Sequence, residues 1–303
     1  MRRAIPRRGV RARWGTMGAM DRAADLSVPS PDESLRRELM ELAADMAGQV
    51  GELVRSAREV GVDVAGVKST ETDVVTQADL AAEHRLRELI AEHRPHDAVL
   101  GEEGGTTAGS SGLTWVLDPI DGTVNYLYGL PQYAVSVAVV AGPPEPGAWT
   151  QVAGAVVNAA DGRTWAAARG LGAWHAGERL RVNAPRPLAQ SLVGTGFGYA
   201  AELRRQQAGV LAGLLDKVRD VRRAGSCALD LCAVASGQLD AYFERGTHVW
   251  DFAAGGLVVR EAGGVMTGLR GAPEGPAMSV AGPAATVAEL VRLLTDAQAD
   301  APL

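Results

Sequence analysis

Two aspartates stand three positions apart in WVLDPIDGTVNYLYG, residues 115–129. Hard divalent cations such as Mg²⁺ prefer oxygen ligands, usually one or two carboxylates with water and substrate phosphate. A strand ending in Asp-Pro-Ile-Asp is expected to make a tight turn with Pro119 at its first corner. That turn would aim Asp118, Asp121 and the carbonyl of Ile120 at one point. An ordinary surface turn explains the segment equally well, since Asp, Pro and Gly are common in turns.

The next two residues favour the metal interpretation. Gly122 and Thr123 directly follow the second aspartate. A short helix beginning there would turn its free N–H groups and positive dipole end toward the same point, which suits a phosphate. Carboxylates that hold metal beside an anion-binding helix start form a layout for phosphoryl transfer to water.

Four more acids stand at the ends of expected elements. Glu102 and Glu103 follow a short strand in a Gly-rich loop, where glutamates are usually only solvated. Asp79 comes three residues after Thr76 and could simply complete a helix cap. Asp251 opens an apolar helix and could also be only a cap. Together with the first two aspartates, however, they indicate a functional site, because functional sites are where a sequence is expected to depart from ordinary local patterns.

Two helices are expected near the start of the chain, the first only packing the core and the second carrying Asp79. For the first, Ser30 is the expected N-cap, Pro31 the first helical residue and Glu33 the partner in a capping box. Its apolar face comprises Leu35, Leu39, Leu42, Met46, Val50 and Leu53. The second helix begins after Thr76. Its expected apolar face comprises Leu80, Leu86, Leu89 and Ile90.

The order of strands and helices changes along the rest of the chain. Strands are expected at 98–100, 114–117, 133–141 and 151–158, and RTWAAARG and GAWH extend an antiparallel meander. From about residue 188, strands (191–196, 239–244, 277–281) alternate with helices (201–216, 226–237, 250–264, 285–297). This order predicts a mixed α/β (α+β) class with two sheets and a division near residue 185.

Composition narrows the class of protein. The chain has 303 residues, of which 47% are hydrophobic and 22% charged, as in a soluble globular enzyme. Six arginines lie within residues 2–13 without an acid, and removing them from the net charge of −6 leaves −12 on the rest. An acidic body argues against nucleic acid as a partner. It suits a protein that gathers carboxylates around cations.

The N-terminal segment is expected to be a disordered basic extension over residues 1–28, with Met17 or Met20 as alternative starts. No hydrophobic region follows the early arginines, which argues against a signal peptide. No apolar run reaches the ~20 residues that a membrane span needs. Cys227 and Cys232 are expected to be reduced core thiols, which favours the cytoplasm.

Two other features carry less chemistry. None of the five histidines falls within the acidic motifs, although His248 lies near Trp250 and is expected to pack or to support the site. The segment GTGFGY, residues 194–199, lacks the spacing of a dinucleotide-binding loop.

WVLDPIDGTVNY, the upstream GEE and the downstream WDFAAGGLVVREAGG together resemble the inositol monophosphatase family. This family is a branch of the Mg²⁺-dependent, lithium-sensitive phosphatases, and the resemblance covers about residues 32–297. It implies a layered αβαβα sandwich of the inositol monophosphatase and fructose-1,6-bisphosphatase type. It also implies one catalytic domain over 29–300, usually in a homodimer.

The resemblance also implies roles for the acids. Glu102 resembles a ligand of a first Mg²⁺ ion, together with Asp118 and the carbonyl of Ile120. Asp118 would bridge to a second ion held by Asp121 and Asp251, so that two or three Mg²⁺ ions serve each site. Two cations ~4 Å apart stabilise both the attacking and the leaving oxygen of an in-line displacement.

The remaining implied roles concern water and substrate. Asp79 and Thr123, with Glu102, resemble the catalytic residues that orient and deprotonate water. Gly122 and Thr123 would seat the phosphate. The implied substrate contacts are Gly225, Ser226, Cys227 and Glu244. Lys68 stands where the family often has a basic residue near the site, although a solvated loop lysine is equally consistent.

The substrate is less constrained than the chemistry. The segments YFERGTHVWD, GSCALDLC and GLPQYAVSVAVV resemble bacterial inositol-1-monophosphatases, and a carboxylate at Glu244 suits a polyol hydroxyl. Inositol-1-phosphate is therefore the expected substrate, with histidinol phosphate next. Fructose bisphosphate and 3′-phosphoadenosine 5′-phosphate are other substrates within the family. Two other classes stay open: a partner of transcription or ribosome-assembly machinery with secondary catalysis, and a non-catalytic sugar-phosphate binder.

Overall fold

A computed structural model describes residues 31–68 and 74–302. The basic segment 1–28, the alternative starts and the expected cap Ser30 lie outside the described residues. Over the described residues, the chain forms mixed α/β layers with three sheets rather than the two expected. The additional sheet is a two-stranded antiparallel ribbon of β1 (Val64–Val67) and β2 (Val74–Thr76).

The larger sheet has eight strands in the order β10-β9-β8-β7-β6-β5-β3-β4. Their bounds are β3 (Ala98–Gly101), β4 (Gly105–Thr107), β5 (Leu113–Asp121), β6 (Ala134–Ala141), β7 (Thr150–Asn158), β8 (Thr164–Ala168), β9 (Gly172–His175) and β10 (Glu178–Arg179). Strands β6 to β9 form the expected antiparallel meander, which β5 and the unpredicted β10 extend, whereas β3 pairs in parallel with β5. The parallel pairing brings the turn that follows β3 beside the acidic end of β5.

The smaller sheet has five strands in the order β12-β11-β13-β15-β14. Their bounds are β11 (Leu192–Thr195), β12 (Asp220–Arg222), β13 (Ala241–Glu244), β14 (Val265–Thr267) and β15 (Ser279–Gly282). Strands β4, β12 and β14 were not expected from the sequence. Each is only three residues long, which is too short to show an alternating pattern.

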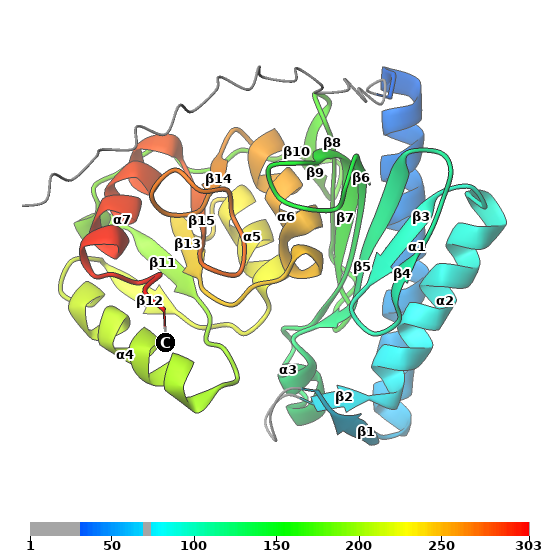
Figure 1. Cartoon of the computed structure of the whole chain (residues 1–303), viewed down its shortest axis with the longest axis horizontal. Helices are drawn as coiled ribbons and strands as arrows, with labels where there is room; N and C mark the ends of the chain where they lie inside the picture. The colour runs from blue at the N-terminus through cyan, green and yellow to red at the C-terminus, as the bar shows by residue number, and fades with distance from the viewer. Residues whose placement is uncertain (1–30, 69–73, 303) are drawn as a thin grey trace, which may run out of the picture.

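Helices lie between and outside the sheets, in the order αβαβα (Figure 1). Helices α1 (Glu33–Val60) and α2 (Gln77–His93) cover the outer face of the larger sheet. Helices α5 (Cys227–Ala235) and α6 (Val249–Glu261) lie between the two sheets. Helices α4 (Ala201–Leu214) and α7 (Ala284–Asp296) cover the far face of the smaller sheet. The remaining turns are α3 (Thr123–Tyr128) and the 3₁₀ helix η1 (Leu188–Gln190).

The first two helices confirm part of the sequence analysis and correct part. Thr76 caps α2 in a capping box with Asp79, as expected. Helix α1 instead begins after Asp32, whose carboxylate accepts a hydrogen bond from the backbone N–H of Leu35 at 2.9 Å. Leu80 is 44% exposed, so its expected place on the apolar face of α2 is wrong. No helix among the described residues has the length and apolar character to cross a bilayer.

The buried face of α2 carries acids. Asp79 and Glu83 are both buried there, one turn apart. Leu86 and Ile90 continue the same face into the core of the larger sheet. Helix α2 is therefore both a packing element and the support for two carboxylates.

Candidate active site

A β-bulge places the two central aspartates. Asp118 pairs with Ser136 and Asp121 with Ala134, so β5 has one residue more than β6 in this interval. Proline lacks an N–H donor and is tolerated at such an irregularity. The expected tight turn is therefore wrong: the Asp-Pro-Ile-Asp segment belongs to the strand itself. Asp118 is only 1% exposed, and its carboxylate accepts a hydrogen bond from the Ile120 N–H at 3.1 Å.

A short helix does begin directly after the bulge. Gly122, with φ of 98°, precedes the six residues of α3. A Cβ at this position would lie 2.7 Å from the carbonyl oxygen of Gln132, so only glycine fits. The Thr123 hydroxyl lies 3.0 Å from the Ile120 carbonyl oxygen and 3.2 Å from Asp79 Oδ1. Its single proton can serve one of these acceptors at a time.

Asp79 combines the cap role and the site role that the sequence left as alternatives. Its Oδ2 accepts hydrogen bonds from the backbone N–H and the hydroxyl of Thr76. Its Oδ1 faces the Thr123 hydroxyl. Burial raises the pKa of Asp79 against the lowering effect of these hydrogen bonds and of Lys68. Asp79 is thus a buried carboxylate with one oxygen held by its helix and the other directed at α3.

The starts of the two central helices contact two carboxylates of the cluster, Asp121 of β5 and Asp251 of α6. Asp121 Oδ2 accepts hydrogen bonds from the Ser226 hydroxyl at 2.5 Å and the Ala228 N–H at 2.7 Å, at the start of α5. Burial is the main cause that raises the pKa of Asp121 to about 6. Asp251, at the start of α6, accepts from the His248 N–H at 2.7 Å. Burial, then the nearby Asp121 and Glu102, raise the pKa of Asp251.

Lys68 is the cation of this acidic cluster. Its Nζ lies 2.7 Å from Glu102 Oε1 and 2.5 Å from Glu103 Oε1, and its side chain is 24% exposed. Burial lowers the pKa of Lys68, but the two glutamates outweigh that effect and raise it. The structure therefore brings Lys68 into the site rather than leaving it as a solvated loop residue.

The acids form one electrostatic cluster with a shortage of positive charge. Burial raises the pKa of Asp118 well above its ordinary value, and Glu102, Asp121 and Asp251 raise it further. Lys68 acts in the opposite direction. A cation bound among these carboxylates would relieve their mutual repulsion.

The donor chemistry fits a hard divalent cation. All the side chains concerned are carboxylates, and the Ile120 carbonyl lies within the same bulge. In the arrangement described, no three Asp, Glu, His or Cys side chains already form a metal-holding group. Asp121, Asp251 and Glu102 are instead turned to Ser226, the His248 N–H and Lys68, respectively. The excess of buried acids still suits an ion, because a carboxylate can exchange a protein donor for an ion.

A cavity of about 360 Å³ opens beside this cluster. Six predicted site residues line it: Asp121, Gly122, Gly225, Cys227, Glu244 and Asp251. Ser226 donates a hydrogen bond to the lining residue Asp121, whereas the other predicted residues are not part of the lining: Glu102, Asp118, Ile120, Asp79 and Thr123. The size and mixed polarity of the cavity suit a small phosphorylated molecule.

Sequence reasoning missed two parts of this lining. Arg223 supplies a positive charge and lowers the pKa of Glu244, against burial, which is the larger effect. The signal was the Arg-Arg pair before Ala-Gly-Ser-Cys. The loop Gly196–Phe197–Gly198–Tyr199 also lines the cavity, although its glycines were considered only for dinucleotide binding.

Glu244 lies at the end of β13, on the side of the cavity away from β5. The Tyr242 hydroxyl donates a hydrogen bond to its Oε2 at 2.5 Å, and burial is the main cause that raises its pKa to about 7. A Cβ on Gly196 would collide with this carboxylate, which explains a glycine there. Glu244 is thus fixed from two sides.

Asn125 is a further residue that sequence reasoning missed. Its side-chain amide donates to the carbonyls of Gln132 at 2.7 Å and Ala224 at 2.9 Å. It therefore ties α3 to the turn that carries Gly225, whose φ is 100°. The signal was the asparagine inside the motif that follows Asp121.

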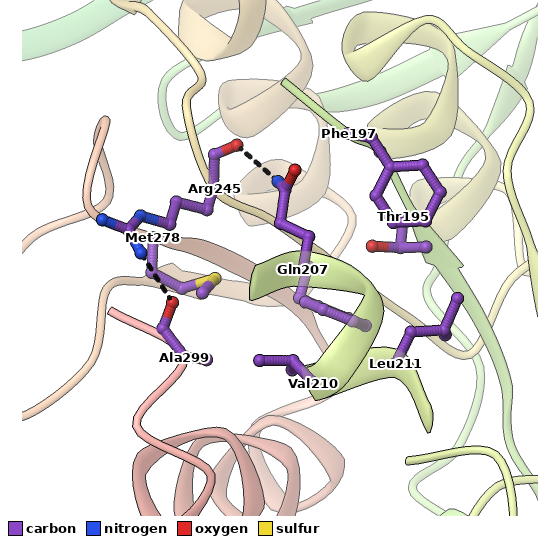
Figure 2. Close-up of a pocket in the computed structure, with 10 residues that line it drawn as sticks. Thr195, Phe197, Gln207, Val210, Leu211, Arg245, Met278 and Ala299 are labelled. Atoms are coloured by element: carbon purple, nitrogen blue, oxygen red, sulfur yellow. Dashed lines mark hydrogen bonds between the residues drawn. The ribbon is translucent and has the colours of Figure 1, made fainter. Parts of the chain in front are cut away.

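The residue after Glu244 anchors this end of the strand (Figure 2). Gln207 donates to the Arg245 carbonyl at 3.1 Å, and the Arg245 guanidinium donates to the carbonyl of Ala301 at 2.8 Å. The neighbouring cavity is about 10 Å³, which is room for one water at most. The region is a structural support and not a second ligand site.

The cysteines and His248 behave as expected from the sequence. Cys227 and Cys232 are free, buried thiols, and burial raises the pKa of both. They are therefore poor nucleophiles. The His248 ring stacks on Trp250 with centroids 4.9 Å apart.

Known proteins and solved structures similar to this chain point to one family. The model of the inositol monophosphatase family matches residues 35–299. The chain is 45% identical over 282 residues to inositol-1-monophosphatase of Mycobacterium leprae, covering 87% of this chain and 94% of the relative. It is 37% identical over 236 residues to Nus factor SuhB of Pasteurella multocida, covering 77% and 86%. Mycobacterium tuberculosis SuhB superposes with a TM-score of 0.74 at 40% identity, covering 88% of this chain and 99% of the solved chain.

The fold and the match together define a phosphatase of the layered αβαβα type. The chain belongs to the inositol monophosphatase family, whose members are generally metal-dependent.

Proposed function

We propose that this chain is a Mg²⁺-dependent phosphomonoesterase that hydrolyses inositol-1-phosphate to inositol and phosphate. The main support is the Thr123 hydroxyl, which lies between Asp79 and the bulge of β5 beside a cluster of buried carboxylates. The cavity next to it ends at Glu244, a hydrogen-bond acceptor for a polyol hydroxyl.

The proposed ions would be held by Glu102, Asp118, Asp121, Asp251 and the carbonyl of Ile120. When bound, two Mg²⁺ ions would neutralise charge on the attacking and leaving oxygens. The N–H groups at Gly122 and Thr123 would orient the phosphate.

The protein's own groups would handle the proton. Water attacks the phosphorus, and its proton passes through the Thr123 hydroxyl to Asp79. The raised pKa of Asp79 makes it a better base near neutrality. The bond between phosphorus and the inositol oxygen breaks, that oxygen takes up a proton from solvent water to become the free hydroxyl, and Asp79 releases its proton to solvent.

The substrate side of the cavity would bind the polyol. Glu244, fixed by Tyr242, would accept a hydrogen bond from a ring hydroxyl. Arg223 would contact a second oxygen of the ring or phosphate. We further propose that the enzyme acts as a homodimer in the cytoplasm, consistent with its two reduced thiols.

The test is phosphate release by the purified protein with Mg²⁺. The substrates compared are inositol-1-phosphate, histidinol phosphate, fructose-1,6-bisphosphate and 3′-phosphoadenosine 5′-phosphate, each with and without lithium. We expect preference for inositol-1-phosphate and loss of turnover with EDTA. Preference for histidinol phosphate would keep the residue roles and change the substrate. EDTA-resistant turnover would contradict the mechanism.

A second candidate function rests on the relatives named Nus factor SuhB. In it, the chain binds transcription machinery and catalysis is secondary. Absence of turnover on all four substrates, together with binding to RNA polymerase, would favour this alternative.

A further inference from the structure

Glu83 occupies an unusual position for a helix carboxylate. It is 2% exposed and reaches from α2 into the turn between β3 and β4. Its Oε2 accepts a hydrogen bond from the backbone N–H of Glu103 at 2.7 Å, and its Oε1 accepts from the N–H of Gly104 at 2.8 Å. The backbone of this turn is thus held by a side chain rather than by strand pairing alone.

The surrounding residues are shaped to this carboxylate. A Cβ at Gly101 or Gly104 would collide with it, so both glycines leave it room. Arg87, one turn further along α2, donates to Glu83 Oε1 at 2.8 Å. The same guanidinium donates to the Gly105 carbonyl at 2.6 Å and to Thr107 Oγ1 at 2.9 Å. Glu83 therefore holds the backbone of the turn, and Arg87 joins it to β4.

This turn carries the acids that meet Lys68. Glu83 holds the N–H of Glu103 itself, and Glu102 is the residue directly before it. Asp79 lies four residues before Glu83 on the same buried face of α2. One helix therefore supports both the proposed proton acceptor and the loop of a proposed metal ligand.

We propose that Glu83 is a positioning residue that fixes the Glu102 turn and thereby sets the affinity of the site for a divalent cation. This inference rests on the proposed function, because Glu102 must be a ligand for the position of the turn to matter. Groups that orient metal ligands typically change metal affinity by about 10-fold to 100-fold when they are replaced.

Glu83→Gln is the discriminating variant. Glutamine has nearly the same shape but one acceptor oxygen, and its NH₂ would face a backbone N–H or the Arg87 guanidinium. The turn would then lose at least one hydrogen bond and shift. We expect about 10-fold to 100-fold weaker binding of Mn²⁺, measured by electron paramagnetic resonance on the metal-free protein. We also expect a matching rise in the Mg²⁺ concentration needed for half-maximal turnover, with kcat recovered at saturating Mg²⁺.

Glu88→Gln is the matched control, since Glu88 lies on the same helix and pairs with Arg85 at 3.1 Å on the surface. It should bind Mn²⁺ like the wild type. A Glu83→Gln protein that melts earlier but binds Mn²⁺ with wild-type affinity would overturn the inference, because a purely structural residue behaves in that way.

A second variant covers the case in which Glu83→Gln fails to fold. Arg87→Lys keeps the charge but removes the fork to Gly105 and Thr107, and it should weaken Mn²⁺ binding in the same direction. Unchanged Mn²⁺ binding in Arg87→Lys would then overturn the inference. A wild-type protein that binds no Mn²⁺ and hydrolyses no substrate would refute the proposed function itself, and this inference with it.

Discussion

At the scale of single residues, Asp118 is a buried acid that three other carboxylates of the site repel. It is almost fully buried, and Glu102, Asp121 and Asp251 all raise its pKa. A site built for stability alone would not keep this arrangement, because like charges in a buried cluster repel one another. This repulsion, which destabilises the metal-free fold, is explained if a cation completes the cluster during turnover.

Asp118→Asn should abolish turnover while preserving the fold. The substitution removes one negative charge from the cluster, so the free energy of unfolding of the metal-free protein should stay the same or rise by about 1 kcal/mol. Thermal melting in EDTA and phosphate release with Mg²⁺ measure the two effects. Near-normal turnover would refute the assignment of Asp118 as a shared metal ligand.

Glu244→Gln separates substrate recognition from hydrolysis. Losing the carboxylate should lower kcat/KM for inositol-1-phosphate. The loss of transition-state stabilisation should be about 1 to 3 kcal/mol, the usual range for one buried hydrogen-bond partner. Hydrolysis of p-nitrophenyl phosphate, which has no ring hydroxyl, should change much less. Equal losses on both substrates would exclude a ring-hydroxyl role.

At the scale of elements, the sequence predicted best where a local signal was complete. The spacing of Leu39, Met46 and Val50 predicts the buried stripe of α1, and all three are fully buried. The Thr76 cap was also predictable, because both partners of a capping box lie three residues apart.

Elements defined by long-range pairing were not predictable in the same way. The bulge at Asp118 exists only relative to β6, so the chain alone suggested a turn. Arg223 and the Gly196 loop reach the cavity through the smaller sheet, which no local pattern specifies. The buried face of helix α2 was also not predictable from local pattern, because it includes the acid Glu83. The N–H groups that bind Glu83 are about twenty residues away in sequence.

Two helix caps allow a matched comparison. Asp32→Ala removes the cap of α1 and should cost about 1 kcal/mol of stability with unchanged kcat. Thr76→Ala removes the cap of α2 at a similar cost, but it also takes away one of the two donors to Asp79 Oδ2 and leaves only the backbone N–H. We therefore expect Thr76→Ala to lower kcat by about tenfold as well, since a misplaced proton acceptor costs rate. Equal kcat values in the two variants would show that the cap of α2 does not support catalysis.

At the scale of the whole molecule, the two sheets meet at the site through α5 and α6. Asp121 comes from the larger sheet, Glu244 from the smaller, and Asp251 from a helix between them. The cavity therefore depends on the packing of all the layers, as Figure 1 shows for their order. Binding of a cation at this site should therefore raise the stability of the entire fold.

Stability should depend on pH in a direction that the buried acids determine. The pKa of Asp121 is raised from 3.8 to about 6 and that of Glu244 from 4.5 to about 7, with burial the main cause for both. Between the ordinary and raised values, the folded protein holds protons that the unfolded chain has released. Their stabilising contribution is full below about pH 4 and is lost as the pH rises through about 6 to 7. Two pKa units correspond to about 3 kcal/mol.

The melting temperature in EDTA should therefore fall as the pH rises from about 5 to about 8. Below that range, acid denaturation is a separate effect that lowers stability. Mg²⁺ binds the ionised carboxylates, so it should raise the melting temperature more at about pH 8 than at about pH 5. Calorimetry at both pH values, with NaCl at matched ionic strength as the control, measures this difference. In Asp118→Asn the Mg²⁺ effect should shrink at both pH values, whereas Glu88→Gln should match the wild type. An Mg²⁺ effect that is equal at the two pH values would contradict a cation site built from these buried acids.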